Sequence, residues 1–186
     1  MRKILTFVAV TLLFMVFAES TYAKENDDLG LDLSKAEITY QDDEITVGHW
    51  GNDPEIAKKI EESSTSVTAI EELSSTEEVP LFKPTKTVTG PGGKVTIDAG
   101  NSGRIIYWSV KPATAWPWTF EGHIALRYYS GYKRNAPIFG LGALGMSDSG
   151  YVTMNKNNGG TATLKGTAYS LDNSKFKVLP GASVPF

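Results

Sequence analysis

Three side chains that could do chemistry lie at regular spacing within residues 118–129. Glu121 precedes His123 by two residues, and Arg127 follows His123 by four. Alternate residues of a strand project from one face, about 7 Å apart per two-residue step, so all three would share one side of a sheet. A carboxylate that orients and charges an imidazole would make a general acid–base pair. A solvated strand face fits the same pattern, because it requires only polar side chains.

Other catalytic signatures are weak. Residues 145–150 resemble the hydrolase elbow Gly-x-Ser-x-Gly only superficially, because the second glycine is displaced by one position and glycine turns precede it. A glycosidase pair would have to be drawn from the four acids of the downstream half, Asp98, Glu121, Asp148 and Asp172. The chain has no cysteine and no phosphate-loop, calcium-loop or zinc-protease motif. We therefore predict no metal site and no cofactor, and we keep a small hydrolase using Glu121 and His123 as one alternative.

Aromatic residues are concentrated around these polar groups. Eight of the twenty aromatic residues fall between positions 104 and 132. Alternation predicts outward positions for Tyr107 and Tyr129, and Trp116 lies in a loop bounded by prolines. Outward rings beside basic side chains can stack on sugars or meet an anionic surface, although half of these rings could simply complete a core. The candidate binding residues are Tyr107, Trp116, Glu121, His123, Arg127, Tyr129, Lys133 and Arg134.

The element that must position these residues is one long strand over residues 118–129. Its odd positions are mostly polar, and its even positions are apolar apart from Gly122. This period of two predicts a strand with one buried face and one wet face. The predicted core residues of the strand are Trp118, Phe120, Ile124, Leu126 and Tyr128.

Further short β-rich runs separated by turn residues predict the fold of residues 80–186. No helix is predicted in this part of the chain. Six or seven strands at this spacing are typical of an antiparallel β-sandwich, of the Ig-like type or a small barrel. The predicted strands, besides residues 118–129, cover residues 86–89, 94–99, 104–110, 151–155, 161–171 and 176–179.

A glycine-rich apolar stretch, residues 135–149, interrupts this pattern. Glycine recurs at positions 140, 142 and 145, with large apolar residues between. Glycine inside a strand pattern marks a bulge, a bend or a close backbone approach, so a kinked strand that closes the sandwich is one interpretation. An apolar loop that enters a membrane or contacts a partner is another, and a ligand pocket lined by backbone is a third. The candidate loop residues are Ile138, Phe139, Leu141, Leu144 and Met146.

Residues 1–23 have the organisation of a secretory signal peptide. Arg2 and Lys3 form a basic start, residues 4–18 are almost continuously apolar, and Ala23 ends a run suited to signal peptidase. These 15 residues are fewer than the roughly 20 needed to span a bilayer, which favours cleavage over a retained anchor. We therefore expect a secreted protein, extracellular or associated with the cell wall. The lack of cysteine fits a bacterium with a single membrane.

The segment between the signal and residue 80 is strongly acidic. Residues 24–79 carry 16 acids against 4 lysines, a charge of −12, whereas residues 80–186 carry 12 Lys and Arg against 4 acids, a charge of +8. This asymmetry and low hydrophobicity predict a pro-segment or spacer that is largely disordered or partly helical. Residues 37–47 could nevertheless form a hairpin. Asp53 and Pro54 predict a helix start, with its end near Glu62.

Three functions remain open from the sequence. The first is a secreted, non-enzymatic binding or surface-interaction protein that contacts cell-wall glycans or another anionic surface through the aromatic and basic residues. The second is a toxin or bacteriocin-like effector whose acidic leader pairs with and neutralises the basic domain until it is removed, with a membrane as target. The third is the hydrolase. We do not expect nucleic acid as a partner, because a secreted protein seldom meets it.

Overall fold

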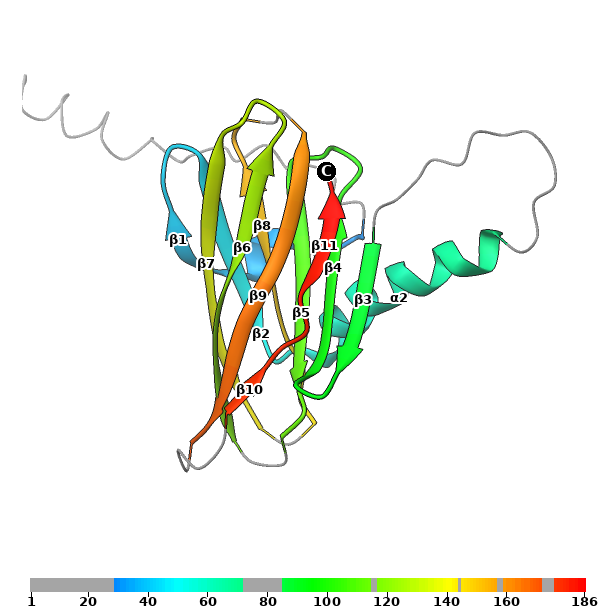
Figure 1. Ribbon diagram of the computed structural model, residues 1–186, viewed down its shortest axis with the longest axis vertical. Coiled ribbons are helices and arrows are strands. Elements are labelled where there is room, and N and C mark those ends of the chain that lie inside the picture. The colour runs from blue at the N-terminus through cyan, green and yellow to red at the C-terminus, as the bar shows by residue number, and fades with distance from the viewer. Residues whose placement is uncertain (1–28, 72–84, 115–116, 144, 157–158, 172–175) are drawn as a thin grey trace, which may run out of the picture.

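The computed structural model describes residues 29–71, 85–114, 117–143, 145–156, 159–171 and 176–186. These residues form two antiparallel β-sheets packed face to face, with an α-helix against the outside of one sheet (Figure 1). The predicted antiparallel β-sandwich is confirmed. Trp116 and Leu144, two of the predicted site residues, lie outside the described residues.

Both sheets are built from strands that are far apart in the sequence. The first sheet has the order β1 (Glu37–Gln41), β2 (Ile45–Gly51), β8 (Asp148–Met154), β5 (Ile105–Pro112), β4 (Gly93–Ala99) and β3 (Thr85–Gly90). The second has the order β10 (Phe176–Val178), β9 (Gly160–Ser170), β6 (Trp118–Tyr128) and β7 (Lys133–Gly142), and β11 (Ala182–Pro185) also pairs with β9. The glycine-rich stretch is therefore mainly an edge strand, β7, rather than a loop.

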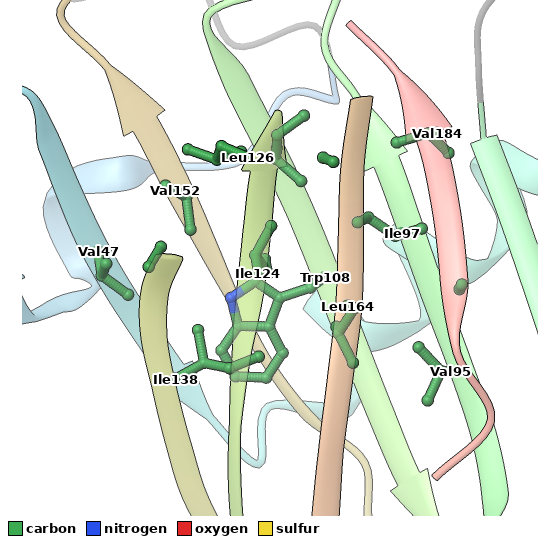
Figure 2. Close-up of a cluster of buried hydrophobic side chains, with 14 of the residues drawn as sticks. Val47, Val95, Ile97, Trp108, Ile124, Leu126, Ile138, Val152, Leu164 and Val184 are labelled. Carbon is green, nitrogen blue, oxygen red and sulfur yellow. The ribbon is translucent and has the colours of Figure 1, made fainter. Parts of the chain in front are cut away.

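The core lies between the sheets and contains the predicted inner row of β6. Trp118, Phe120, Ile124 and Leu126 are fully buried, and Tyr128 is almost so. Figure 2 shows Ile124 and Leu164 of the second sheet gathered around Trp108 of the first. The gap in the row at Gly122 also has a packing reason. A Cβ at Gly122 would lie 2.7 Å from the Phe120 ring, and one at its partner Gly166 on β9 would lie closer still, so the two glycines make room for that ring.

The acidic segment is part of this sandwich. Its predicted hairpin is confirmed as β1 and β2, and β2 lies between β1 and β8 in the first sheet. Ile45 and Val47 of β2 are fully buried in the common core. An isolated hairpin is marginal in water, and pairing with β8 supplies the packing that it lacks. The sequence suggested that the sandwich starts at residue 80, but in the structure it begins upstream, with β1.

The helix α2 (Pro54–Glu71) covers the outer face of the first sheet. The predicted start is confirmed, since the backbone N–H groups of Glu55 and Ile56 both donate to Asp53 Oδ1, at 2.9 and 3.2 Å. The helix continues beyond the predicted end near Glu62. A short 3-10 helix, η1 (Leu33–Lys35), precedes β1. No helix in the described part of the chain is both long and apolar enough to cross a bilayer.

The position of α2 corrects one predicted site residue. Tyr107 does project from the outer face of the first sheet, but it is fully buried there in a second apolar cluster. This cluster also contains Ile60 of α2 and Tyr151 of β8. A strand period reports which face a side chain is on, not whether another element covers that face. Tyr107 is therefore a core residue and is not available to a ligand.

Candidate functional site

The outward face of the second sheet carries most of the predicted binding residues. Glu121, His123 and Arg127 project from this face of β6, which lies between β7 and β9. Glu121 is opposite Phe139 of β7 and Thr167 of β9, and His123 is opposite Pro137 and Lys165. Glu121 is exposed and His123 is half-buried. Among the described residues no hydrogen bond or ion pair joins the two side chains, which is the pattern of a solvated strand face.

Two of the basic candidates are engaged by the protein itself. Arg127 Nη1 donates to the carbonyl oxygens of Leu126 and Arg134, at 2.9 and 3.0 Å, and to Asn135 Oδ1 at 3.1 Å. The Arg134 guanidinium forms an ion pair with Asp42 and also donates to Tyr40 Oη. Both guanidinium groups therefore hold neighbouring segments together, each through one terminal nitrogen. Lys133, by contrast, is exposed.

Tyrosines gather at the turn that joins β6 to β7. The rings of Tyr128 and Tyr132 lie against each other with centroids 5.7 Å apart. Tyr129, which lies between them in the sequence, is 75% exposed. The Tyr132 hydroxyl donates to Glu44 Oε2 at 2.5 Å. Glu44 follows β1, and the β1–β2 turn lies at the same end of the sandwich as the β6–β7 turn (Figure 1). We call the following residues together the tyrosine turn: Glu44, Tyr128, Tyr129, Tyr132, Lys133 and Lys156.

A small hollow of about 100 Å³ opens within the tyrosine turn, and Glu44, Tyr128, Tyr132 and Lys156 line it. Lys156 Nζ lies 4.0 Å from Glu44 Oε1 at its rim. The hydrogen bond to the Glu44 carboxylate raises the pKa of Tyr132, and burial raises the pKa of Tyr128, so both phenols keep their protons at neutral pH. The hollow thus offers aromatic rings, two hydroxyls, a carboxylate and an ammonium group.

The sequence did not identify most of this hollow. Glu44 and Tyr132 are 88 residues apart, so nothing in their local spacing relates them. Tyr128 was assigned to the core and is indeed mostly buried, although it also lines the hollow. The available signal was the run Tyr128-Tyr129-Ser130-Gly131-Tyr132, in which a glycine turn separates aromatic residues. Such a turn at a strand end presents its side chains to solvent.

Ion pairs connect the acidic segment to the basic half of the chain at several places. Arg134 pairs with Asp42, as described above, and Lys94 Nζ lies 2.5 Å from Glu61 Oε2 of α2. These pairs are partly shielded from water, since the Asp42 and Glu61 side chains are mostly buried, whereas the Lys156 side chain near Glu44 is largely exposed. The oppositely charged segments of the sequence thus meet along the edge and the outer face of the first sheet.

The predicted apolar loop residues do not lie on one surface. Ile138 is buried in the core, because it lies on the inward face of β7, whereas Phe139 and Leu141 lie on the outward face and are exposed. Met146, beyond the end of β7, is also exposed. The strand period divides the set between core and surface, so the loop interpretation is corrected to an edge strand with two exposed apolar side chains.

A histidine–aspartate pair lies between the sheets, with the histidine partly exposed, and the sequence did not reveal it. His49 Nε2 and Asp148 Oδ1 are 2.7 Å apart, and the Asp148 side chain is completely buried. Asp148 Oδ1 also accepts the Ser149 backbone N–H, whereas Oδ2 has no hydrogen-bond partner. Burial raises the pKa of Asp148, and the hydrogen bond from His49 opposes that effect. The two residues are 99 positions apart, which hides the pair from any local pattern.

Aromatic rings and a glycine enclose this pair. The His49 ring stacks on Trp108, with centroids 6.0 Å apart, and the tilted Phe139 ring has its centroid 6.3 Å from that of His49. Gly140 of β7 faces the Asp148 carboxylate, and a Cβ there would overlap Oδ2. The pair links β2 to β8 beneath β7. Among the described residues, no hydroxyl or amine side chain hydrogen-bonds to the imidazole.

No group of three or more histidine, aspartate or glutamate side chains in the described ranges is placed to hold a metal ion. Searches against protein-family models and against curated proteins find no match to this chain.

Proposed function

We propose that this protein is a secreted, non-enzymatic binding protein that contacts cell-wall glycans through the tyrosine turn. The observation that carries the proposal is the hollow lined by Glu44, Tyr128, Tyr132 and Lys156, together with the exposed Tyr129, which follows Tyr128 in the chain. Secretion rests on the signal-like residues 1–23.

The chemistry of the tyrosine turn suits a sugar. Aromatic rings present an apolar face to the C–H groups of a sugar ring and a hydroxyl to its polar edge. Glu44 accepts hydrogen bonds from sugar hydroxyls, and Lys156 donates to ring or carbonyl oxygens. Lys133 adds a positive charge for the carboxylate or phosphate groups of an anionic wall polymer.

The size of the hollow favours a surface contact over an enclosed site. Its volume of about 100 Å³ is well below the range of about 300–1,000 Å³ typical of pockets that enclose a small molecule. It has room for one substituent of a sugar unit, while the remainder of a polymer would lie across Tyr129 and the neighbouring surface. A shallow contact of this kind supports binding to a long repeating ligand.

The test is co-sedimentation of the purified protein with isolated cell walls, comparing Tyr129→Ala with the wild type. We expect at least about a tenfold loss of affinity, the typical effect of removing a central aromatic anchor. The melting temperature should stay within about 2 °C of the wild type, because the side chain is 75% exposed.

Tyr169→Ala is the matched control, since Tyr169 is an exposed tyrosine at the other end of the same sheet. Equal wall binding by wild type and Tyr129→Ala would contradict the proposal. An equal loss for Tyr129→Ala and Tyr169→Ala would place the glycan contact elsewhere on the sheet.

A further inference from the structure

A second surface feature lies at the opposite end of the outward face of the second sheet. Five large apolar side chains there are between 43% and 67% exposed. We call them the apolar corner: Phe139, Leu141, Tyr169, Leu171 and Val178. Exposed apolar side chains that cluster in this way mark contact surfaces, whereas single ones are ordinary.

The strand register places the apolar corner on both sides of β6. Leu141 of β7 and Tyr169 of β9 are both opposite Thr119 of β6, so they flank it on the same face. One row further along, Phe139 is opposite Glu121, and Val178 of β10 is opposite Thr167. The apolar side chains thus lie in two adjacent rows on β7, β9 and β10, with Leu171 directly after β9. Thr119 and Glu121 of β6 and Thr167 of β9 stand between them.

The neighbouring edge of β7 is a poor place for another strand to add. Pro137 lies in the middle of β7, the edge strand, and has no backbone N–H to offer a ladder. Proline in an edge strand is a recognised device against strand addition. An occupant of the apolar corner must therefore bind through side chains on the sheet face, not by extending the sheet.

The charge of this face favours an anionic occupant. Among the described residues of β6, β7 and β9, the outward charged side chains are Arg127, Lys133, Lys165 and the single carboxylate Glu121. Apolar side chains at one end of a basic face are the combination with which proteins attach to bilayers that contain anionic lipid. Tyr169 adds an aromatic ring with a polar hydroxyl, which suits the headgroup level of a membrane.

We propose that the apolar corner docks this protein on the surface of a bilayer rich in anionic lipid. Phe139, Leu141 and Leu171 enter the headgroup–acyl boundary, and Lys165 lies above them against lipid phosphates. Glu121 opposes this attraction, because it brings a carboxylate into the contact. The tyrosine turn at the other end of the face stays available for a glycan.

The experiment is co-sedimentation of the full secreted protein with vesicles of phosphatidylglycerol and phosphatidylcholine, and with vesicles of phosphatidylcholine alone. The wild type should bind the first kind and not the second, and binding should weaken as salt is raised. Leu141→Ser with Leu171→Ser should reduce binding roughly tenfold or more, since each removes an apolar side chain from the contact. Glu121→Gln should strengthen it.

Ile38→Ser is the matched control, because Ile38 is an exposed apolar residue on β1 of the other sheet. Absence of vesicle binding by the wild type would overturn the proposal, as would unchanged binding by the double serine variant. Light scattering after size exclusion provides the remaining outcome. A wild-type dimer that the double serine variant converts to monomer would assign the apolar corner to a second copy of the chain instead.

Discussion

Replacing Gly140 by alanine places a methyl group where a buried carboxylate already lies. A Cβ at this position would overlap Asp148 Oδ2 and come within 2.6 Å of Cγ. The carboxylate cannot simply turn away, because its other oxygen accepts hydrogen bonds from His49 at 2.7 Å and from the Ser149 N–H at 3.0 Å. Either β7 moves away from the first sheet, or these hydrogen bonds are lost.

Both outcomes lower the free energy of unfolding. Overpacking of a core typically costs about 1–3 kcal/mol, and a buried group left without its hydrogen bond also costs about 1–3 kcal/mol. Whichever outcome applies, we expect Gly140→Ala to destabilise the protein by about 1–3 kcal/mol. Urea unfolding followed by tryptophan fluorescence measures this, since Trp108 stacks on His49 and reports on the same region.

A double-mutant cycle shows whether Asp148 is the cause. In Gly140→Ala with Asp148→Ala, the new methyl group occupies space that the carboxylate has vacated, so the double variant should be more stable than the sum of single effects by at least about 1 kcal/mol. Gly90→Ala is the control, because a Cβ there meets only Pro180 at 3.4 Å. Additive effects, or a Gly140→Ala variant within about 0.5 kcal/mol of wild type, would refute the packing argument.

Two further predictions concern charge and the acidic segment. Burial raises the pKa of Asp148, so the stability that this group contributes is fully present below the ordinary aspartate pKa of about 4 and is lost as pH rises through the raised value. Urea unfolding at pH 4, 5.5 and 7 should therefore show the wild type losing stability relative to Asp148→Asn, and the opposite trend would mean that the charged pair with His49 dominates. A fragment of residues 80–186 lacks β1, β2 and α2, and we expect circular dichroism to show no cooperative melting, because β8 loses one of its two partner strands and Tyr107 loses its cover. Melting at the temperature of the full chain would instead establish an independent downstream domain.

Local patterns in the sequence were enough to predict the parts that depend on short-range physics. The alternation within residues 118–129 predicted the buried row of β6, because the side-chain period of a strand is independent of its neighbours. Asp53 and Pro54 predicted the start of α2, since capping involves only the first turn of a helix. The repeated phrases around residues 38 and 45 predicted a hairpin, because its strands are adjacent in the chain.

Charge along the chain gave a less direct prediction. The contrast in charge between residues 24–79 and 80–186 suggested a pro-segment or spacer followed by a separate domain. In the structure, however, β2 is an interior strand of the common sheet. Composition averages over a segment and does not register that Ile45 and Val47 occur at alternate positions within it. The burial of Ile45 and Val47 and the backbone pairing of β2 with β8 place the acidic hairpin in the sandwich.

What the sequence determined by itself was the alternation of faces, the helix start and the β-rich class of the fold. Only the tertiary structure decided which outward faces stay open. It covers Tyr107 with α2, brings Glu44 to Tyr132, joins His49 to Asp148 and leaves Leu141 in water. These outcomes depend on strands 88 or 99 residues apart meeting in one sandwich, and no local periodicity carries that information.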